Sequence, residues 1–335
     1  MPALSAAEIV RAIEDAFTES TAAALLVSKA RAHPKRFYVT AGESSFPVWI
    51  YAWTLTHGGG AARPKDEYRI QLTSVTPPLP ENPDGPTLLL GYEPNTGCFA
   101  GFDLRKHRRF STQSPSIQIS ISALREAVRD GFAFTRKGND EIAVAFRPDN
   151  MLAYCLNSEN LHESGADASV SSLLSKVGRF EPVTERELAT IPLERRRVVS
   201  KMSRLARDSD FRRKVVVAYD RKCCVTGLQL RLIDAAHILP VGAEGSTDDV
   251  QNGLCLSPTY HRAYDRGLIY LAEDRRMLIN PKKKDELVRL GLGGGLRDFE
   301  ANLGREIFLP ADRTQWPRPE FIRAANDFRK QQGLT

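Results

Sequence analysis

The most informative segment of this chain runs from Cys224 to Tyr270 and reads CVTGLQLRLIDAAHILPVGAEGSTDDVQNGLCLSPTYHRAYDRGLIY. It holds His237 in an apolar segment, Asn252 at the start of a second apolar segment, and His261 four residues before Asp265. Two of the six histidines of the chain fall inside this window. Imidazole and carboxylate groups can accept protons and bind metal ions, so the window concentrates reactive side chains.

The pattern around these residues predicts a β-hairpin followed by a helix. In chain order we expect a strand at 232–238, a loop at 242–249, a strand at 252–256 and a helix at 258–266. On that helix His261 and Asp265 are four residues apart, so both side chains project from one face toward the same point. This pair suits Mg²⁺, Mn²⁺ or another transition ion with water positions left open.

Residues from about 195 to 335 resemble the HNH endonuclease family, and specifically the branch found in restriction-type enzymes. The matching segments, in order, are FRRKVVVAYD, CVTG, AAHILP, NGLCLS and YHRAYDRG. The resemblance implies a ββα-metal nuclease domain with flanking helices. Phosphodiester hydrolysis needs a base that takes a proton from water, a cation that stabilises charge on the phosphate, and a scaffold that fixes both.

The resemblance implies a role for each matching residue. His237 falls on the first His of the motif, the general base, and imidazole suits this task because its ordinary pKa is about 6.5. Asn252 matches the central Asn, which in the family pins the connecting loop or orients the base. His261 matches the second His, a metal ligand, and we expect Asp265 to be a ligand beside it.

One position departs from the family pattern. Many members carry an acid or a second His directly before the general base, where it binds the metal, and this chain has Ala236 there. Asp234 is the nearest carboxylate and would point to the same side of an extended strand, so we expect it to supply the missing ligand. The departure also leaves open a DNA-binding or regulatory protein whose HNH fold has lost activity.

Basic side chains in two regions are candidates for contacts with DNA phosphates. Such contacts would give salt-dependent affinity that does not read sequence, and the alternative for each is a solvated surface charge. One group lies in or near the motif, and the other in the basic loop LRKHRRF at 104–110. The candidates are Arg105, Lys106, Arg108, Arg109, Arg212, Arg213, Lys214, Arg262 and Arg266.

The chain as a whole predicts an α+β protein of two domains, because 335 residues is long for one compact domain. Short strand-like runs and helical stretches in 1–156 predict a mixed domain with largely antiparallel sheet, to which we assign DNA recognition. Residues 157–192, rich in Ser, Glu and Ala, predict a linker, and 193–335 the nuclease domain. Trp49, Tyr51 and Trp53 form an aromatic strand face, which favours core packing over a pocket for an extruded base.

The composition of the chain limits the kinds of partner and cofactor that we expect. The 47 basic and 41 acidic residues give a net charge of +6, which permits a polyanion but does not demand one. Five cysteines without a CxxC pair favour buried reduced thiols over disulfides or a structural zinc. The N-terminus predicts an amphipathic helix rather than a signal peptide, and no run reaches the roughly 20 apolar residues of a membrane span, so we expect a cytoplasmic protein without a membrane partner.

These features together predict a metal-dependent DNA endonuclease, with restriction or phage defence as its role. The expected substrate is double-stranded DNA, selected by sequence or by a modified base. A homodimer is a further hypothesis, because cutting both strands with a single-site nuclease often requires two copies. An HNH nuclease of repair, nicking or RNA cleavage is the alternative enzyme.

Overall fold

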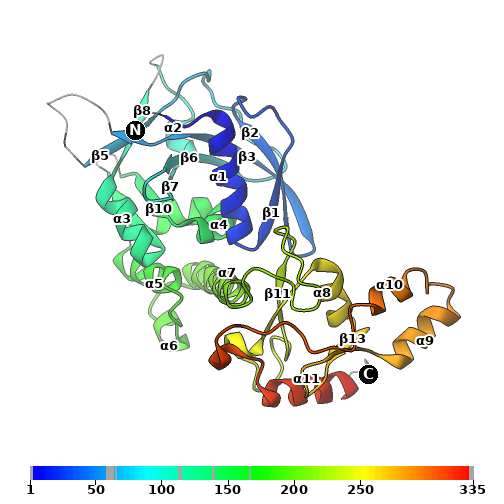
Figure 1. Cartoon of the computed structure of the whole chain (residues 1–335). Helices are drawn as coiled ribbons and strands as arrows, with labels where there is room; N and C mark the ends of the chain where they lie inside the picture. Colours follow the sequence, from blue (N-terminus) through cyan, green and yellow to red (C-terminus); the bar gives the residue numbers. More distant parts are fainter. Residues whose placement is uncertain are drawn as a thin grey trace. The chain divides into compact units, whose positions relative to one another are not determined.

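The computed structural model describes residues 3–57, 64, 66–111, 115–137, 140–165 and 167–331. It divides into two compact units, which we call the first unit (Met1–Ser209) and the second unit (Asp210–Thr335). Both units combine helices with largely antiparallel strands, which confirms the α+β prediction (Figure 1). Within the described residues no helix has the length and apolar character needed to cross a membrane.

The first unit is built on a seven-stranded sheet in the order β1-β2-β3-β6-β7-β10-β9, in which only the β3–β6 pair is parallel. A smaller sheet has the order β4-β5-β8. The elements are α1 (Ala6–Glu19), β1 (Ala22–Leu26), β2 (Lys35–Ala41), β3 (Ser44–Thr54), β4 (Thr56–His57), β5 (Glu67–Gln71), β6 (Thr87–Glu93), β7 (Cys98–Phe102), α2 (Leu104–His107), β8 (Ser116–Ser120), α3 (Ile121–Asp130), β9 (Phe132–Arg136), β10 (Ile142–Phe146), α4 (Met151–Ser164), α5 (Ala168–Gly178), α6 (Glu185–Leu188) and the larger part of α7 (Leu193–Ala218).

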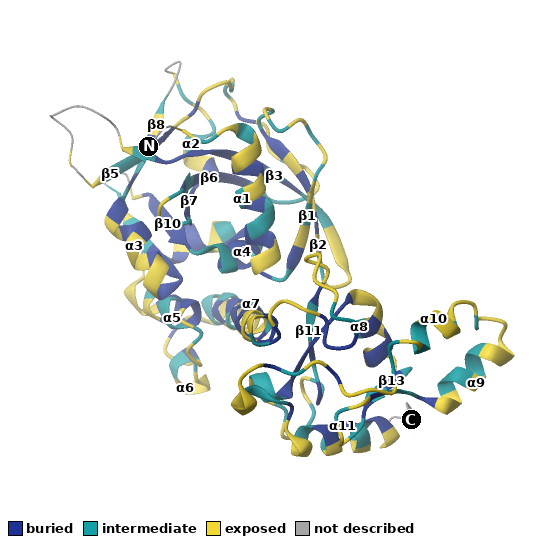
Figure 2. Ribbon diagram, in the orientation of Figure 1, coloured by how far each residue is buried: buried dark blue, intermediate teal, exposed yellow. Residues whose placement is uncertain are grey.

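Two apolar clusters cover the two faces of the large sheet, because alternate residues of each strand point to opposite sides. On β3, Val48 and Ile50 belong to the cluster that includes α1 and α4, whereas Tyr51 and Trp53 belong to the cluster that includes α3 and the smaller sheet. β7 and β10 are buried along their whole length, whereas β1 and β2 carry exposed residues as well (Figure 2). Tyr51 and Trp53 are core residues, as expected, while Trp49 is half-buried beneath the Arg36 guanidinium.

Local signals explain where the helices of the first unit begin and end. Ser5 and Glu8 form a capping box at the start of α1, and Gly131, with a φ of 77°, ends α3. The expected basic loop 104–110 begins instead as the short helix α2, because the Asp103 carboxylate accepts a hydrogen bond from the Arg105 backbone N–H and caps it.

The segment 157–192 differs from the expected linker. It completes α4 and forms α5 and α6, and its apolar residues Val170, Leu174 and Ile191 are buried in the core of the first unit. The compact units divide at Ser209–Asp210, within α7, rather than near residue 192. The Ser- and Glu-rich composition of the segment favoured a linker. A helix needs only one apolar face to pack into a core, however, and composition does not show such a face.

The second unit contains two short antiparallel hairpins packed among helices. Its elements are the end of α7, β11 (Asp234–His237), β12 (Gly253–Leu256), α8 (Pro258–Asp265), β13 (Ile269–Leu271), β14 (Met277–Ile279), α9 (Pro281–Arg289), α10 (Leu296–Glu300) and α11 (Pro319–Gln331). β11 pairs with β12, so that His237 lies opposite Gly253, and β13 pairs with β14. The predicted hairpin and helix are present, with slightly shorter strands. All five cysteines of the chain are unpaired and buried, as expected.

Candidate active site

One cavity of the second unit brings together side chains from three elements. It has a volume of about 350 Å³ and lies between β11, α8 and α11. Its lining residues are Ala235, His237, Pro240, Val241, His261, Asp265, Phe328 and Arg329. Three of the residues expected in the site, His237, His261 and Asp265, therefore share one space although 28 positions of sequence separate the first from the last.

The hairpin and the helix each present one face to this cavity. Ala235 and His237 line it, whereas Ala236 between them is 1% exposed and belongs to the apolar core. Pro258 occupies the first turn of α8, where a missing backbone N–H costs nothing. The four-residue spacing then places His261 and Asp265 on the same side of the helix, with Tyr264 buried against the core.

Asn252 is fully buried and ties down the loop that joins the two strands of the hairpin. Its Oδ1 accepts a hydrogen bond from the Leu239 N–H at 2.9 Å. Its Nδ2 donates to the Leu239 carbonyl at 3.2 Å, the Thr247 carbonyl at 2.8 Å and the Ser246 hydroxyl at 3.3 Å. Both the oxygen and the nitrogen of the side-chain amide thus bond to one loop. These contacts fix the conformation of the loop and leave the amide no free group for a substrate.

His237 is held by a carboxylate and by an aromatic ring. Its Nε2 lies 3.0 Å from the Asp248 Oδ1, and Asp248 belongs to the loop that Asn252 fixes. The imidazole stacks on Phe211 with ring centroids 3.7 Å apart and planes inclined by 11°. A carboxylate at Nε2 favours the tautomer that carries its proton there, which leaves a lone pair on Nδ1.

His261 lies between two carboxylates. Its Nδ1 is 3.7 Å from the Asp234 Oδ2, and its Nε2 is 3.4 Å from the Asp265 Oδ2. Burial of the ring opposes protonation, but the contact with Asp234 and the charges of Asp265 and Asp234 outweigh it, so the pKa of His261 is raised. The two acids therefore create a spot at which positive charge is favoured.

The positions of these two acids differ from the expectation for Asp234. An imidazole binds a metal ion through one nitrogen, and its other nitrogen usually donates to a carboxylate. Asp265 lines the cavity at one ring nitrogen of His261, and Asp234 contacts the opposite nitrogen. A metal ion bound at one nitrogen of His261 would therefore lie beside only one of these two carboxylates. Across the described parts of the chain, no three His, Cys, Asp or Glu side chains form a group able to hold a metal.

Comparison with known proteins identifies the hairpin and helix. A family model described as HNH endonuclease matches residues 223–272, which contain His237, Asn252, His261 and Asp265. The second unit carries an HNH endonuclease domain. The chain is therefore a nuclease, as the resemblance in its sequence implied.

Two further comparisons concern the rest of the chain. A family model described as Methylase-associated X1 matches residues 46–155, from β3 into α4. One similar solved structure is a "Modification dependent TagI restriction endonuclease", with 14% sequence identity, coverage of 83% of this chain and 80% of that chain, and a TM-score of 0.29. The search of curated proteins finds no match.

The basic residues expected near the HNH domain have different surroundings. Arg212 donates to the carbonyl of Ile233, directly before β11, at 3.0 Å. Arg213 and Lys214 both pair with Asp210, at 2.6 and 2.5 Å. Arg262 and Arg266 are exposed, on α8 and at its C-terminal end.

The basic residues of the first unit are partly neutralised. Arg105 pairs with Asp103 at 3.0 Å and with Glu163 at 2.9 Å, and Arg108 pairs with Glu81. Burial opposes the charged carboxyl of Asp103, but Arg105 outweighs it and lowers its pKa. Lys106 and Arg109 are exposed.

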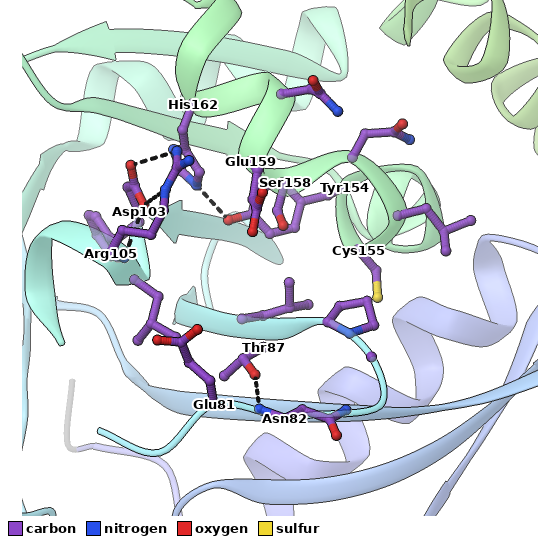
Figure 3. A pocket seen from close by; sticks show the side chains of 18 residues that line it. Glu81, Asn82, Thr87, Asp103, Arg105, Tyr154, Cys155, Ser158, Glu159 and His162 are labelled. Carbon is purple, nitrogen blue, oxygen red and sulfur yellow. Dashed lines mark hydrogen bonds and ion pairs between the residues drawn. The ribbon is translucent and has the colours of Figure 1, made fainter. Parts of the chain in front are cut away.

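A second cavity, of about 370 Å³, lies in the first unit between the start of β6, the end of β7, α2 and α4 (Figure 3). Leu88, Phe102 and Leu104 give it apolar walls, and Ser158 and Glu159 of α4 add polar groups. At its edge the Tyr154 hydroxyl lies 3.0 Å from His162 Nε2, and His162 Nδ1 lies 2.6 Å from the Ile142 carbonyl. The stack of aromatic residues on β3, by contrast, is not part of this cavity's lining.

Three residues of the site lie outside the sequence-based set: Asp248, Phe211 and Arg329. Asp248 is one of two adjacent acids in a polar loop, so only its contact with His237 distinguishes it from Asp249. Phe211 lies in the segment FRRKVVVAYD, where its apolar character alone predicts core packing. Arg329 follows the motif by more than one helix and one hairpin, and no spacing rule connects it to His237.

Proposed function

We propose that this chain is a metal-dependent DNA endonuclease of a restriction or phage-defence system, in which the second unit cuts DNA and the first unit selects it. The observation that carries the proposal is the single cavity lined by His237, His261 and Asp265 within the HNH endonuclease domain. The methylase-associated match over residues 46–155 supports a role beside DNA methylation.

In this proposal His237 is the general base. Its Nδ1 takes a proton from the attacking water, while Asp248 at Nε2 holds the ring orientation and stabilises the imidazolium that forms. Stacking on Phe211 restricts the ring further. Asn252 acts indirectly, because it fixes the loop that carries Asp248.

The metal that the family implies fits a smaller ligand set than the sequence predicted. His261 Nε2 and the Asp265 carboxylate would hold Mg²⁺ or Mn²⁺, and Asp234 would orient His261 through Nδ1. A divalent ion supplies a Lewis acid that neutralises charge on the scissile phosphate. Two protein ligands suit Mg²⁺, which keeps several waters and takes further oxygens from substrate phosphates.

We further propose that the first unit reads DNA at its cavity, by receiving an extruded base. The volume of about 370 Å³ falls in the ordinary range of small-ligand sites, roughly 300–1,000 Å³. Flipped bases are held between apolar or aromatic side chains and read by a few hydrogen-bonding groups, a combination that this lining offers. Lys106 and Arg109, and on the second unit Arg212, Arg262 and Arg266, are the proposed phosphate contacts.

A plasmid assay tests the function. We expect the chain to cut double-stranded DNA with Mg²⁺ or Mn²⁺ and not with EDTA. Cutting of modified plasmid alone supports modification-dependent restriction, and cutting of unmodified plasmid alone supports a methyltransferase-protected enzyme. Nicking without linear product favours a repair or nicking enzyme, and binding without cutting an inactive regulatory protein. A rate that rises with the square of protein concentration supports a homodimer.

The cavity of the first unit supplies a matched control for the same assay. Ser158→Trp places a large side chain in the cavity and should abolish discrimination between modified and unmodified plasmid. Hydrolysis of a small substrate, bis(4-nitrophenyl) phosphate, should stay unchanged because the second unit is intact. Unaltered discrimination by the folded variant would contradict the proposed reading site, not the nuclease.

Replacement of the two acids around His261 separates ligand from orienting group. Asp265→Ala should raise the dissociation constant for Mn²⁺ by about 100-fold, and Asp234→Asn by about 10-fold. Loss of a residue that only orients a metal ligand typically lowers metal affinity by roughly 10–100-fold. Isothermal titration calorimetry on the full chain measures both. Asp274→Asn, which removes an exposed acid paired with Arg276, is the control. The reverse order would make Asp234 the ligand, as the sequence first suggested.

A further inference from the structure

Arg329, near the end of α11, places a positive charge in the wall of the active-site cavity. The residue is 3% exposed and lines the same space as His237, His261 and Asp265. Its Nη1 is buried and has no hydrogen-bond partner among the residues that the structure describes. A guanidinium buried with an unused donor costs folding free energy, so this donor is available to a ligand that enters the cavity.

The position of this guanidinium is fixed from one side. Its Cζ lies over the ring of Tyr264 at 4.0 Å from the centroid, a cation–π contact that holds the planar group without neutralising its charge. The Tyr264 hydroxyl donates to the carbonyl of Ile238 at 3.2 Å, directly after the general base. Arg329 is thereby connected to the strand that carries His237 through one rigid side chain.

The chemistry of the cavity indicates which ligand Arg329 fits. A guanidinium offers planar paired donors that match a phosphate group, and it binds such anions more strongly when water is excluded. On the proposed function, the cavity receives one phosphodiester of DNA, which carries a single negative charge. We propose that Arg329 is a phosphate-binding residue of the active site and donates to a non-bridging oxygen of the phosphate that is attacked.

This role rests on the proposed function and differs from a purely structural one. If Arg329 only packed α11 against Tyr264, its loss would lower the unfolding temperature and leave the rate of the folded enzyme unchanged. If it binds the attacked phosphate, its loss slows hydrolysis in protein that is fully folded. Charge added on the phosphate in the transition state makes the contact stronger there than in the ground state.

The test uses Arg329→Met, Arg329→Lys and, as a matched control, Lys330→Met. Lys330 is the next residue, exposed and paired with Asp327, so its loss removes the same charge outside the cavity. Hydrolysis of bis(4-nitrophenyl) phosphate reports the chemistry without DNA recognition. We expect Arg329→Met to be slower by about 100-fold, the cost of one donor to a developing charge, and Arg329→Lys to recover part of the rate. Lys330→Met should match the wild type.

A folded Arg329→Met variant within about threefold of the wild-type rate would overturn the proposal, since one donor to a developing charge is worth far more. Should methionine prevent folding, the comparison of Arg329→Lys with Lys330→Met decides in the same way. If the wild type hydrolyses neither bis(4-nitrophenyl) phosphate nor plasmid DNA, the proposed nuclease function itself fails. Binding of a short DNA duplex, measured by fluorescence anisotropy, then replaces hydrolysis as the readout. Weaker binding by Arg329→Met than by Lys330→Met would then support the phosphate contact, and equal binding would refute it.

Discussion

Replacement of His237 by alanine is expected to lower the single-turnover rate of DNA cleavage by about 1000-fold, because a positioned general base contributes roughly 10²–10⁴-fold. The ring is a surface of the cavity rather than a member of its packed core, so the second unit should stay folded. Circular dichroism and the unfolding temperature check the fold, and a gel assay at saturating enzyme measures the rate.

Two matched experiments make this result specific to proton transfer. Added imidazole should restore part of the activity of His237→Ala, because removal of the ring beside Phe211 leaves a space of the same shape. Asp248→Asn should lower the rate less, by about 10-fold, since it changes only the partner of Nε2. A His237→Ala enzyme that cuts as fast as the wild type would show that another group accepts the proton.

Asn252→Ala is expected to cost the second unit about 3 kcal/mol of unfolding free energy, because it leaves buried backbone groups of the loop without partners. Cleavage should fall as well, since the loop carries Asp248, the partner of His237. Urea unfolding followed by tryptophan fluorescence measures the stability, and the plasmid assay measures cleavage.

Gln251→Ala provides the control for this variant. Gln251 precedes Asn252 at a partly exposed position, and its side-chain Nε2 donates to the Thr314 carbonyl at 2.7 Å. It should change stability by less than about 1 kcal/mol. Equal losses for the two variants would mean that the amide of Asn252 does not fix the loop.

The proximity of the candidate site residues could be predicted largely because their spacing is local. A helix brings residues four apart to one face, and a short hairpin returns Asn252 to the strand of His237, so both juxtapositions follow from period and turn length. Asp234 shows where this reasoning ends. Alternation along a strand gives its side, but it does not say which nitrogen of His261 its carboxylate would meet.

The features that could not be predicted depend on distant contacts. Arg329 reaches the cavity only because α11 packs against the hairpin's core, and Asp248 differs from Asp249 only in the conformation of a pinned loop. In the first unit, the burial of Val170 and Leu174 depends on the sheet that they cover, so the composition of 157–192 alone favoured a linker. The aromatic face of β3 was predictable because strands alternate.

Asn252 is followed directly by Gly253 in the sequence, and this has a consequence for the lifetime of the enzyme. In a flexible chain, an asparagine before glycine loses ammonia readily, because the glycine nitrogen attacks the side-chain amide to form a cyclic imide. Here the amide is held by the loop, and the glycine N–H donates to the Val250 carbonyl. The native state therefore shields this bond from ageing, while each excursion to the unfolded state exposes it, so prolonged heating should inactivate the enzyme irreversibly.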